Sequence, residues 1–107
     1  MKIIRVASDF SKTPGGRFRS MGPKSGEEFR DIVAASLARG EAVTVVLDGV
    51  EGYGSSFLEE AFGGLARLKR WTHVELLRLL RIEAKTPEFK TYEREAKQYL
   101  DEAFMRA

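Results

Sequence analysis

Apolar and polar residues follow two periods along this chain, one typical of strands and one typical of helices. Three short segments predict strands because they are rich in β-branched apolar residues or alternate apolar with charged residues: residues 2–7, 42–47 and 80–84. The middle segment, Ala-Val-Thr-Val-Val-Leu, is apolar almost throughout. That pattern indicates a strand buried on both faces, as expected at the centre of a parallel or mixed sheet.

Longer segments place apolar residues at helical spacing and predict helices: residues 25–39, 55–68, 72–79 and 86–104. Three of these helices begin with the spacing of a capping box, a Ser or Thr followed three residues later by Glu: Ser25 and Glu28, Ser56 and Glu59, Thr72 and Glu75. Each box is expected to satisfy two backbone N–H groups at the start of its helix.

The alternation of strands and helices predicts an α/β fold. We expect one domain over residues 1–107, with a mixed or parallel central sheet of about four strands joined by crossover helices. Residues 8–24 hold three glycines and two prolines among many polar residues, so they are predicted to form a loop with a brief extended stretch at residues 17–19.

Composition narrows the classes of function. The chain has no cysteine, and it has no apolar run near the ~20 residues that a membrane span requires. The short, mixed apolar start does not resemble a signal peptide, so we expect a soluble cytoplasmic protein. His73 is the one histidine and has no histidine partner for a metal site or a proton relay. Without a nucleophile and base pair, we expect no enzyme activity and no cofactor.

The net charge of +2 conceals a segregation of charges along the chain. Residues 1–24 carry a net charge of +5, residues 25–66 carry −6, and the remaining residues carry +3. This pattern indicates internal complementarity, an anion site or, least favoured, a weak nucleic-acid footprint, because an acidic middle separates the bases. Trp71 follows Arg67, Lys69 and Arg70, and we interpret these bases as partners of a helix C-terminus.

The first candidate site is the turn between the central strand and the second long helix. Ligands of open α/β sheets favour this end of the strands, and the N–H groups of a helix start stabilise an anion such as a phosphate carried on a side chain. The candidate residues for phosphorylation and partner binding are Asp48, Tyr53, Gly54, Ser55 and Ser56. In the alternative interpretation, one serine caps the helix and the other only fills the turn.

The second candidate site lies in the predicted loop. Consecutive glycines allow backbone amides to point at an anion, and arginine offers a fork of donors for its oxygens. The candidate anion-binding residues are Thr13, Gly15, Gly16, Arg17 and Arg19. The segment lacks the Gly-Lys-Ser/Thr ending of a Walker loop, and the alternative interpretation is a plain reverse turn.

Three sequence blocks carry a resemblance to a known family: Asp-Phe-Ser-Lys-Thr-Pro-Gly-Gly-Arg from residue 9, Ser-Gly-Glu-Glu-Phe-Arg from residue 25, and Gly-Tyr-Gly-Ser-Ser-Phe-Leu-Glu-Glu-Ala-Phe-Gly-Gly-Leu from residue 52. Together they resemble the bacterial STAS-like family of unknown function. The strand, turn and helix around residue 55 also resemble the STAS domains of anti-sigma-factor antagonists. The antagonists are switched by phosphorylation of a serine in this turn, and Ser55 occupies the position of that serine. Gly54 and Phe57 stand where the antagonists have an acid and a glycine.

The resemblance implies a regulatory signalling module whose partner is a serine kinase with a histidine-kinase-like ATPase fold. Our leading hypothesis is therefore a non-enzymatic binding module that docks a partner protein through the Ser55 turn. The alternative is a domain that binds a small ligand or nucleotide phosphate, with the Gly15-Gly16-Arg17 loop closing over that turn. Both hypotheses predict that Ser55 is exposed, and the second also predicts that Arg17 lies on the same side of the domain as Ser55.

Overall fold

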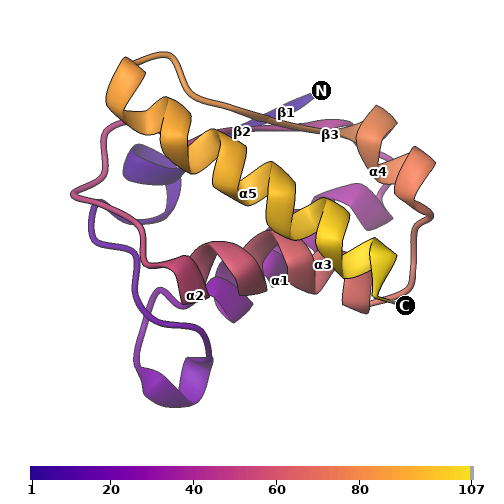
Figure 1. The fold of residues 1–107 in the computed structure, drawn as a ribbon, viewed down its shortest axis with the longest axis horizontal. Coiled ribbons are helices and arrows are strands. Elements are labelled where there is room, and N and C mark those ends of the chain that lie inside the picture. The colour runs from indigo at the N-terminus through magenta and orange to yellow at the C-terminus, as the bar shows by residue number, and fades with distance from the viewer. Residues whose placement is uncertain (107) are drawn as a thin grey trace.

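A computed structural model describes residues 1–106 as an α/β fold (Figure 1). Within these residues the chain forms three strands and five α-helices: β1 (Lys2–Arg5), α1 (Gly26–Ala38), β2 (Val43–Val46), α2 (Ser55–Leu58), α3 (Gly64–Arg67), α4 (His73–Leu79), β3 (Leu80–Glu83) and α5 (Pro87–Met105). None of the helices in the described part of the chain is both long enough and apolar enough to cross a membrane.

The sheet has the order β1-β2-β3, and both neighbouring pairs are parallel. The predicted central strand therefore does lie at the centre, where Val45 pairs with Ile4 on one side and with Ile82 on the other. The predicted fourth strand is not confirmed within residues 1–106. Residues 17–19, which the sequence marks as briefly extended, pair through Arg17 with the start of α1 and then enter a 3₁₀ turn, Arg19–Met21.

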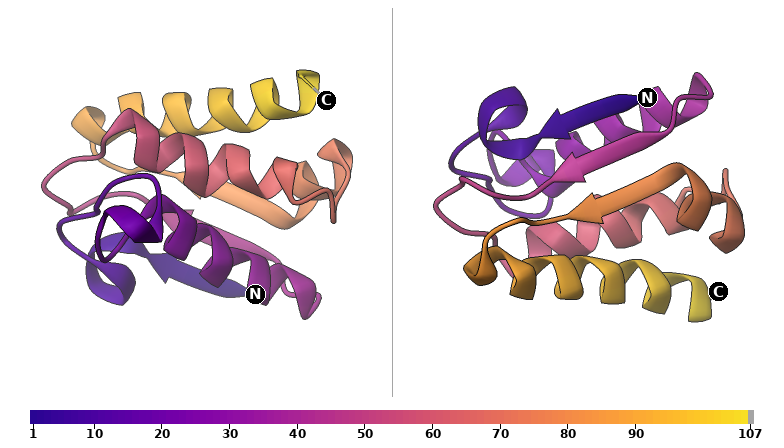
Figure 2. Two further views of the ribbon diagram at one scale, coloured as in Figure 1. Left: turned by 90° about the horizontal axis from the view of Figure 1, so that it is seen from below. Right: turned by 90° about the horizontal axis from the view of Figure 1, so that it is seen from above.

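All the long helices cover one face of the sheet, and Figure 2 shows the other face without a covering helix. The period of two along the strands explains this arrangement. In β1, the side chain of Ile4 is 3% exposed on the helix side, whereas Ile3 is 42% exposed on the open side. In β3, Leu80 and Ile82 are buried and Arg81 between them is exposed. The core therefore fills the space between one face of the sheet and the helices.

A helical rod crosses the middle of the helix layer. Helix α2, a π-helical turn at Glu59–Gly63 and α3 follow one another with helical backbone angles at both junctions. We call residues 55–67 the central helix. A Cβ on Gly63 would lie 2.6 Å from Oε2 of Glu59, and one on Gly64 would lie 2.9 Å from Oε2 of Glu60. The two glycines therefore leave room for two carboxylates to fold back against the helix.

Phenylalanine rings fill the core beneath the central helix. Phe29 of α1 packs edge-on against Phe10, with ring centroids 5.1 Å apart, and lies 6.1 Å from the ring of Phe57. Phe57 is in turn 5.7 Å from the ring of Tyr53. Such aromatic pairs add to the hydrophobic stabilisation of the core. Because Phe57 and Tyr53 flank residues 54–56, this cluster fixes the start of the central helix.

The three predicted capping boxes have different outcomes. The box of Thr72 and Glu75 is confirmed, because each side chain accepts the other residue's backbone N–H. In the first box Ser25 accepts the N–H of Glu28, but the Glu28 carboxylate accepts the N–H of Lys24. The box at Ser56 is wrong. Gly54, which has no side chain for capping, is the N-cap of α2, and the carboxylate of Glu59 binds Arg17 and Arg67 and not a backbone N–H.

The predicted first strand is also shorter than the sequence suggests. It ends at Arg5, and Val6–Phe10 forms a helical turn. A carboxylate causes this early end, because Oδ2 of Asp9 accepts the backbone N–H of Arg5 at 2.8 Å. The turn directs the chain away from the sheet and into the following loop.

Candidate functional site

The predicted position of Ser55 is confirmed. Ser55 and Ser56 are the first two residues of α2, and both are exposed. The preceding turn depends on Gly49, whose φ of 92° is a left-handed conformation that favours glycine. The hydroxyl groups thus lie in the first turn of the central helix, where backbone N–H groups lack helical partners. Whether either serine is modified stays a prediction.

Asp48 and Tyr53, two other candidates in this turn, have structural partners. Asp48 accepts the backbone N–H groups of Lys85 and Thr86 at 2.8–3.0 Å and also the Thr86 hydroxyl. Burial opposes ionisation of Asp48, but these hydrogen bonds outweigh it and lower its pKa. The buried Tyr53 hydroxyl donates to the carbonyl of Leu47 at 2.7 Å, and burial raises the pKa of Tyr53. These two side chains position the turn.

The loop of residues 11–24, with its five candidate residues, folds against the start of α1. The N–H of Gly15 donates to the carbonyl of Lys24, and the carbonyls of Gly16 and Arg17 accept the first N–H groups of α1, from Gly26 and Glu27. The loop thereby supplies the partners that a helix start requires. The amide of Gly15, which the anion-site alternative uses, is occupied within the chain. Thr13 lies nearby, where its N–H donates to the hydroxyl of Ser11.

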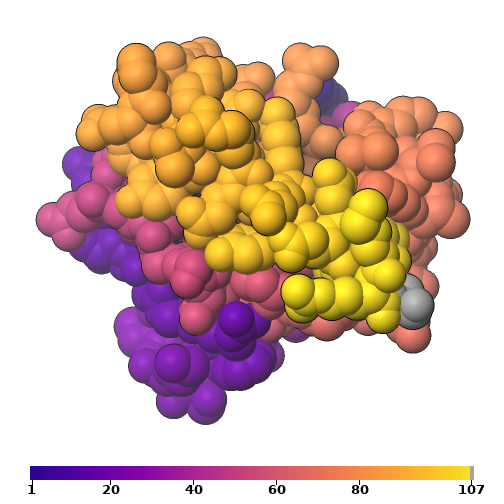
Figure 3. Space-filling model, viewed as in Figure 1, coloured from indigo at the N-terminus to yellow at the C-terminus, as the bar shows by residue number. Residues whose placement is uncertain are grey.

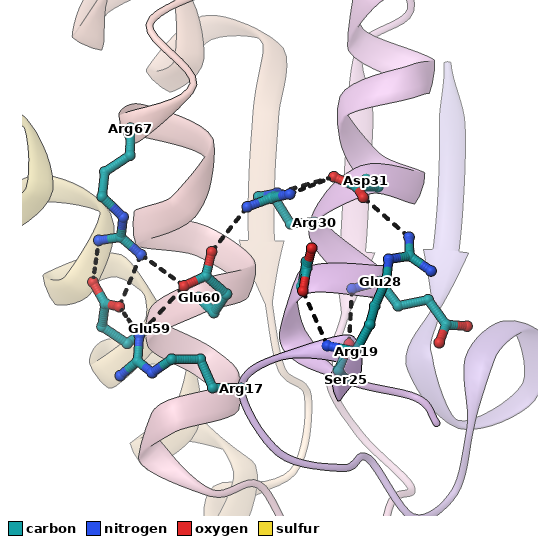
Figure 4. A network of polar contacts seen from close by, with 10 residues as sticks. Arg17, Arg19, Ser25, Glu28, Arg30, Asp31, Glu59, Glu60 and Arg67 are labelled. Atoms are coloured by element: carbon teal, nitrogen blue, oxygen red, sulfur yellow. Dashed lines mark hydrogen bonds and ion pairs between the residues drawn. The ribbon is translucent and has the colours of Figure 1, made fainter. Parts of the chain in front are cut away.

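Arg17 lies on the same side as the central helix, as expected, but its partners are acids. Its Nη1 lies 2.5 Å from Oε1 of Glu59 and 3.4 Å from Oε1 of Glu60 (Figure 4). Arg67 binds both oxygens of Glu59, at 2.6 and 2.9 Å, and Arg30 binds Glu60 at 2.9 Å. Hydrogen bonds from Arg67 lower the pKa of Glu59, with burial opposing them and Arg17 adding to them. Glu60 is only 5% exposed and has three arginine partners.

The network continues from Arg30 across α1 to the tip of the loop. Arg30 binds Oδ1 of Asp31 at 2.8 Å, and Arg19 binds the other oxygen at 3.0 Å (Figure 4). Burial opposes ionisation of Asp31, but the hydrogen bonds from Arg19 and Arg30 lower its pKa. The backbone N–H of Arg19 also donates to Glu27. Both predicted arginines of the anion site therefore hold the loop in place through carboxylates.

Sequence analysis missed two exposed apolar side chains on this loop. Phe18 is 44% exposed and Met21 is 66% exposed. Figures 1 and 2 show the loop projecting from the body at the same end of the molecule as the start of α2. The signal available in the sequence was the presence of two large apolar residues in a polar, glycine-rich loop without any period. These two apolar side chains are left uncovered by the part of the chain that the structure describes.

Metal-binding side chains are not clustered within residues 1–106. Within residues 1–106 no group of three or more histidine or acidic side chains is placed to hold a metal ion. His73 lies in α4, where its Nε2 is 2.8 Å from Oδ1 of Asp101 and its ring stacks on Phe104. The side chains near Ser55 are hydroxyls, exposed apolar groups and ion-paired charges.

Comparison with known proteins assigns a family to the middle of the chain. Residues 25–71 match the model of a protein family described as a STAS-like domain of unknown function (DUF4325). This segment begins at the cap of α1 and includes β2, the Ser55 turn and the central helix. The family resemblance is thus confirmed over residues 25–71, which are similar to a STAS-like domain. Searches of curated proteins and of solved structures found no match.

Proposed function

We propose that this chain is a non-catalytic regulatory binding module that docks a partner protein at one end of the domain. The docking surface consists of Phe18, Met21, Ser55 and Ser56. One observation carries the proposal: exposed apolar side chains on a projecting loop lie at the same end as exposed hydroxyls in the first turn of the central helix. Large apolar side chains with polar neighbours are the usual contacts of protein interfaces.

Fixed geometry of the loop supports this proposal. Arg17 and Arg19 bind acids of the central helix and α1, and backbone hydrogen bonds join Gly16 and Arg17 to the start of α1. A loop held before binding loses less conformational entropy when a partner docks. The ion pairs therefore have a role in positioning Phe18 for a partner, beyond their role in stability.

The proposed regulation is phosphorylation of Ser55 by a serine kinase of the histidine-kinase-like ATPase fold. A phosphate on the first residue of a helix is stabilised by free N–H groups and by the helix dipole. The pKa of Tyr99, a residue of α5, is sensitive to the Ser55 hydroxyl. Burial and a hydrogen bond to Glu95 raise the pKa of Tyr99, whereas the Ser55 hydroxyl lowers it. A phosphate on Ser55 would place negative charge on the side of α2 that faces α5, so we expect it to alter the environment of Tyr99.

Phosphate binding by the loop is the alternative function, and it requires a rearrangement. Arg17 would have to leave Glu59, and the amide of Gly15 would have to leave the carbonyl of Lys24. We therefore rank it second. If a phosphate ligand released this loop, adding the ligand would make the backbone amides of residues 11–24 exchange faster.

A kinase assay tests the proposed regulation. The purified chain is incubated with ATP and a serine kinase of the stated fold from the same organism, and phosphate is located by mass spectrometry. We expect one phosphate on Ser55, lost in Ser55→Ala and kept in the matched control Ser56→Ala. Phosphate confined to other residues, or none, contradicts this regulation. Turnover of a nucleotide or phosphoester by the chain alone, abolished by Arg17→Ala or Ser55→Ala, would show that the module is an enzyme.

A further inference from the structure

A hollow lies at the opposite end of the central helix from Ser55. It has a volume of about 700 Å³ and is formed where the end of α3, the connection to α4 and the C-terminal part of α5 meet. Figure 3 shows the end of α5 beside the segment that includes residues 68–79. Side chains that carry charge or an aromatic ring line much of it: Arg67, Lys69, Arg70, Trp71, Phe104 and Arg106. Its volume is within the range of small-molecule sites.

Two aromatic rings form the apolar part of this hollow. Trp71 and Phe104 are half-buried, so each ring packs on the core with one part and faces the hollow with another. The ring of Phe104 is fixed, because it stacks on His73 with centroids 4.6 Å apart and planes inclined by 20°. His73 is itself held by Asp101. The hollow thus has a preformed surface against which a planar ring can lie.

The charge around the rings is predominantly positive. Lys69 and Arg70 are exposed, and neither forms an ion pair with any residue in the part of the chain that the structure describes. Lys69 has a left-handed φ of 57°, and its N–H donates to the carbonyl of Ala66. The acid that lines the hollow, Glu75, is engaged by the backbone of Thr72 in the capping box.

We infer that this hollow binds a small aromatic anion of the size of a nucleoside monophosphate. Its ring would pack on Trp71 and Phe104, and its anionic group would be bound by Lys69 and Arg70. A guanidinium and an ammonium beside an aromatic surface supply the charge-assisted hydrogen bonds and the apolar contact that such a ligand requires. A nucleic-acid strand fits less well, because strands bind along a groove with successive aromatic platforms.

Trp71 provides the experiment, because it is the chain's one tryptophan and lines the hollow. Fluorescence of Trp71 is recorded during titration with AMP, with adenosine and with inorganic phosphate, and each titration is repeated by calorimetry. We expect AMP to give a saturable change with a Kd of about 0.1 mM, and both partial ligands to bind at least about tenfold more weakly. Equal binding of adenosine overturns the anionic part of the inference, and equal binding of phosphate overturns the aromatic part.

Variants locate the site. The double variant Lys69→Gln with Arg70→Gln should bind AMP at least about tenfold more weakly, because two charge-assisted contacts are lost. The matched control, Arg39→Gln with Lys12→Gln, removes two exposed cations elsewhere and should bind AMP as the wild type does. Melting curves check that both variants are folded. Absence of saturable AMP binding to the wild type, or equal loss in both double variants, overturns the inference, and neither result bears on the docking proposal.

Discussion

Arg17 and Glu59 are 42 positions apart in the sequence, and their side chains form an ion pair that joins the loop of residues 11–24 to the central helix. The pair lies one turn beyond Ser55 and Ser56. Because Glu59 also binds Arg67, one carboxylate connects the loop with the far end of the same helix. The position of the loop, and with it the position of Phe18, therefore depends on acids of the central helix.

Replacing Arg17 by alanine should loosen this loop with a modest loss of stability. The ion pair is partly exposed and Arg67 still holds Glu59, so we expect a loss of about 1 kcal/mol in the free energy of unfolding. Urea unfolding measures the loss, and hydrogen exchange should show faster exchange confined to residues 11–24. Arg39→Ala, which removes an exposed arginine paired with Glu41, is the control and should change neither measurement. Unchanged exchange in the loop would show that backbone hydrogen bonds alone hold it.

Glu60 should matter more for stability than its neighbour Glu59. Its side chain is almost fully buried and is bound by arginines from the loop, α1 and α3. Glu60→Ala would remove a buried carboxylate from three arginines that keep Glu59 or Asp31 as partners, and we expect a loss of about 2–3 kcal/mol. Glu60→Gln, which keeps the shape and one acceptor oxygen, should lose less. Thermal and urea unfolding check this order, and a smaller loss for Glu60→Ala than for Glu59→Ala would contradict it.

Gly26 allows α1 to approach the central helix closely. A Cβ at this position would lie 2.6 Å from the carbonyl oxygen of Phe57 and 3.2 Å from its Cα. Both are backbone atoms, so the helices would have to separate, and we expect Gly26→Ala to lose about 1–3 kcal/mol. Gly52→Ala is the matched control, because a Cβ there would meet only the Tyr92 hydroxyl, at an ordinary contact distance of 3.5 Å. Chemical denaturation of both variants tests this, and equal stability would disprove the close approach.

Acid should destabilise the domain through carboxylates such as Asp48. Its pKa in the folded state lies below its ordinary value of 3.8, so its contribution to stability is present above that value and is lost as the pH falls through the folded pKa. We expect Asp48→Asn to lose about 1–3 kcal/mol at pH 7 and to show a smaller further loss than the wild type below about pH 5. Glu88→Gln, at an exposed position, is the control for charge alone. If the free energies of unfolding of the wild type and of Asp48→Asn fell equally as the pH was lowered, this role of Asp48 would be contradicted.

Local patterns were sufficient to predict most of the elements. The apolar run at residues 42–47 identified the central strand, and the box of Thr72 and Glu75 identified the start of α4, because both signals depend on neighbouring residues. The box at Ser56 failed for a reason outside its own segment. The carboxylate of Glu59 binds Arg17 and Arg67. Arg17 lies 42 positions away, and a local pattern cannot predict such a partner. The strand count failed likewise, because the loop pairs with a helix start.

The sequence predicted where the Ser55 turn lies, but not which of its side chains hold the turn and which are exposed. The strand, turn and helix pattern placed Ser55 correctly, whereas Asp48 and Tyr53 proved to hold the turn. The exposure of Phe18 depends on how the loop folds, which its sequence does not reveal. The hollow beside Trp71 also depends on tertiary structure, because Phe104 reaches it from a helix more than 30 positions further along the chain.

Calorimetric titration of the partner kinase tests the docking surface most directly. The wild type and the Lys69→Gln, Arg70→Gln double variant, which is altered at the other end of the domain, should bind the kinase with equal affinity. Phe18→Ala with Met21→Ala should weaken binding at least about tenfold because the exposed apolar contacts are lost, and Ser55→Asp should weaken it by placing a charge in the interface. Unchanged affinity in both of these variants, with binding intact in the wild type, would contradict docking through the Ser55 end.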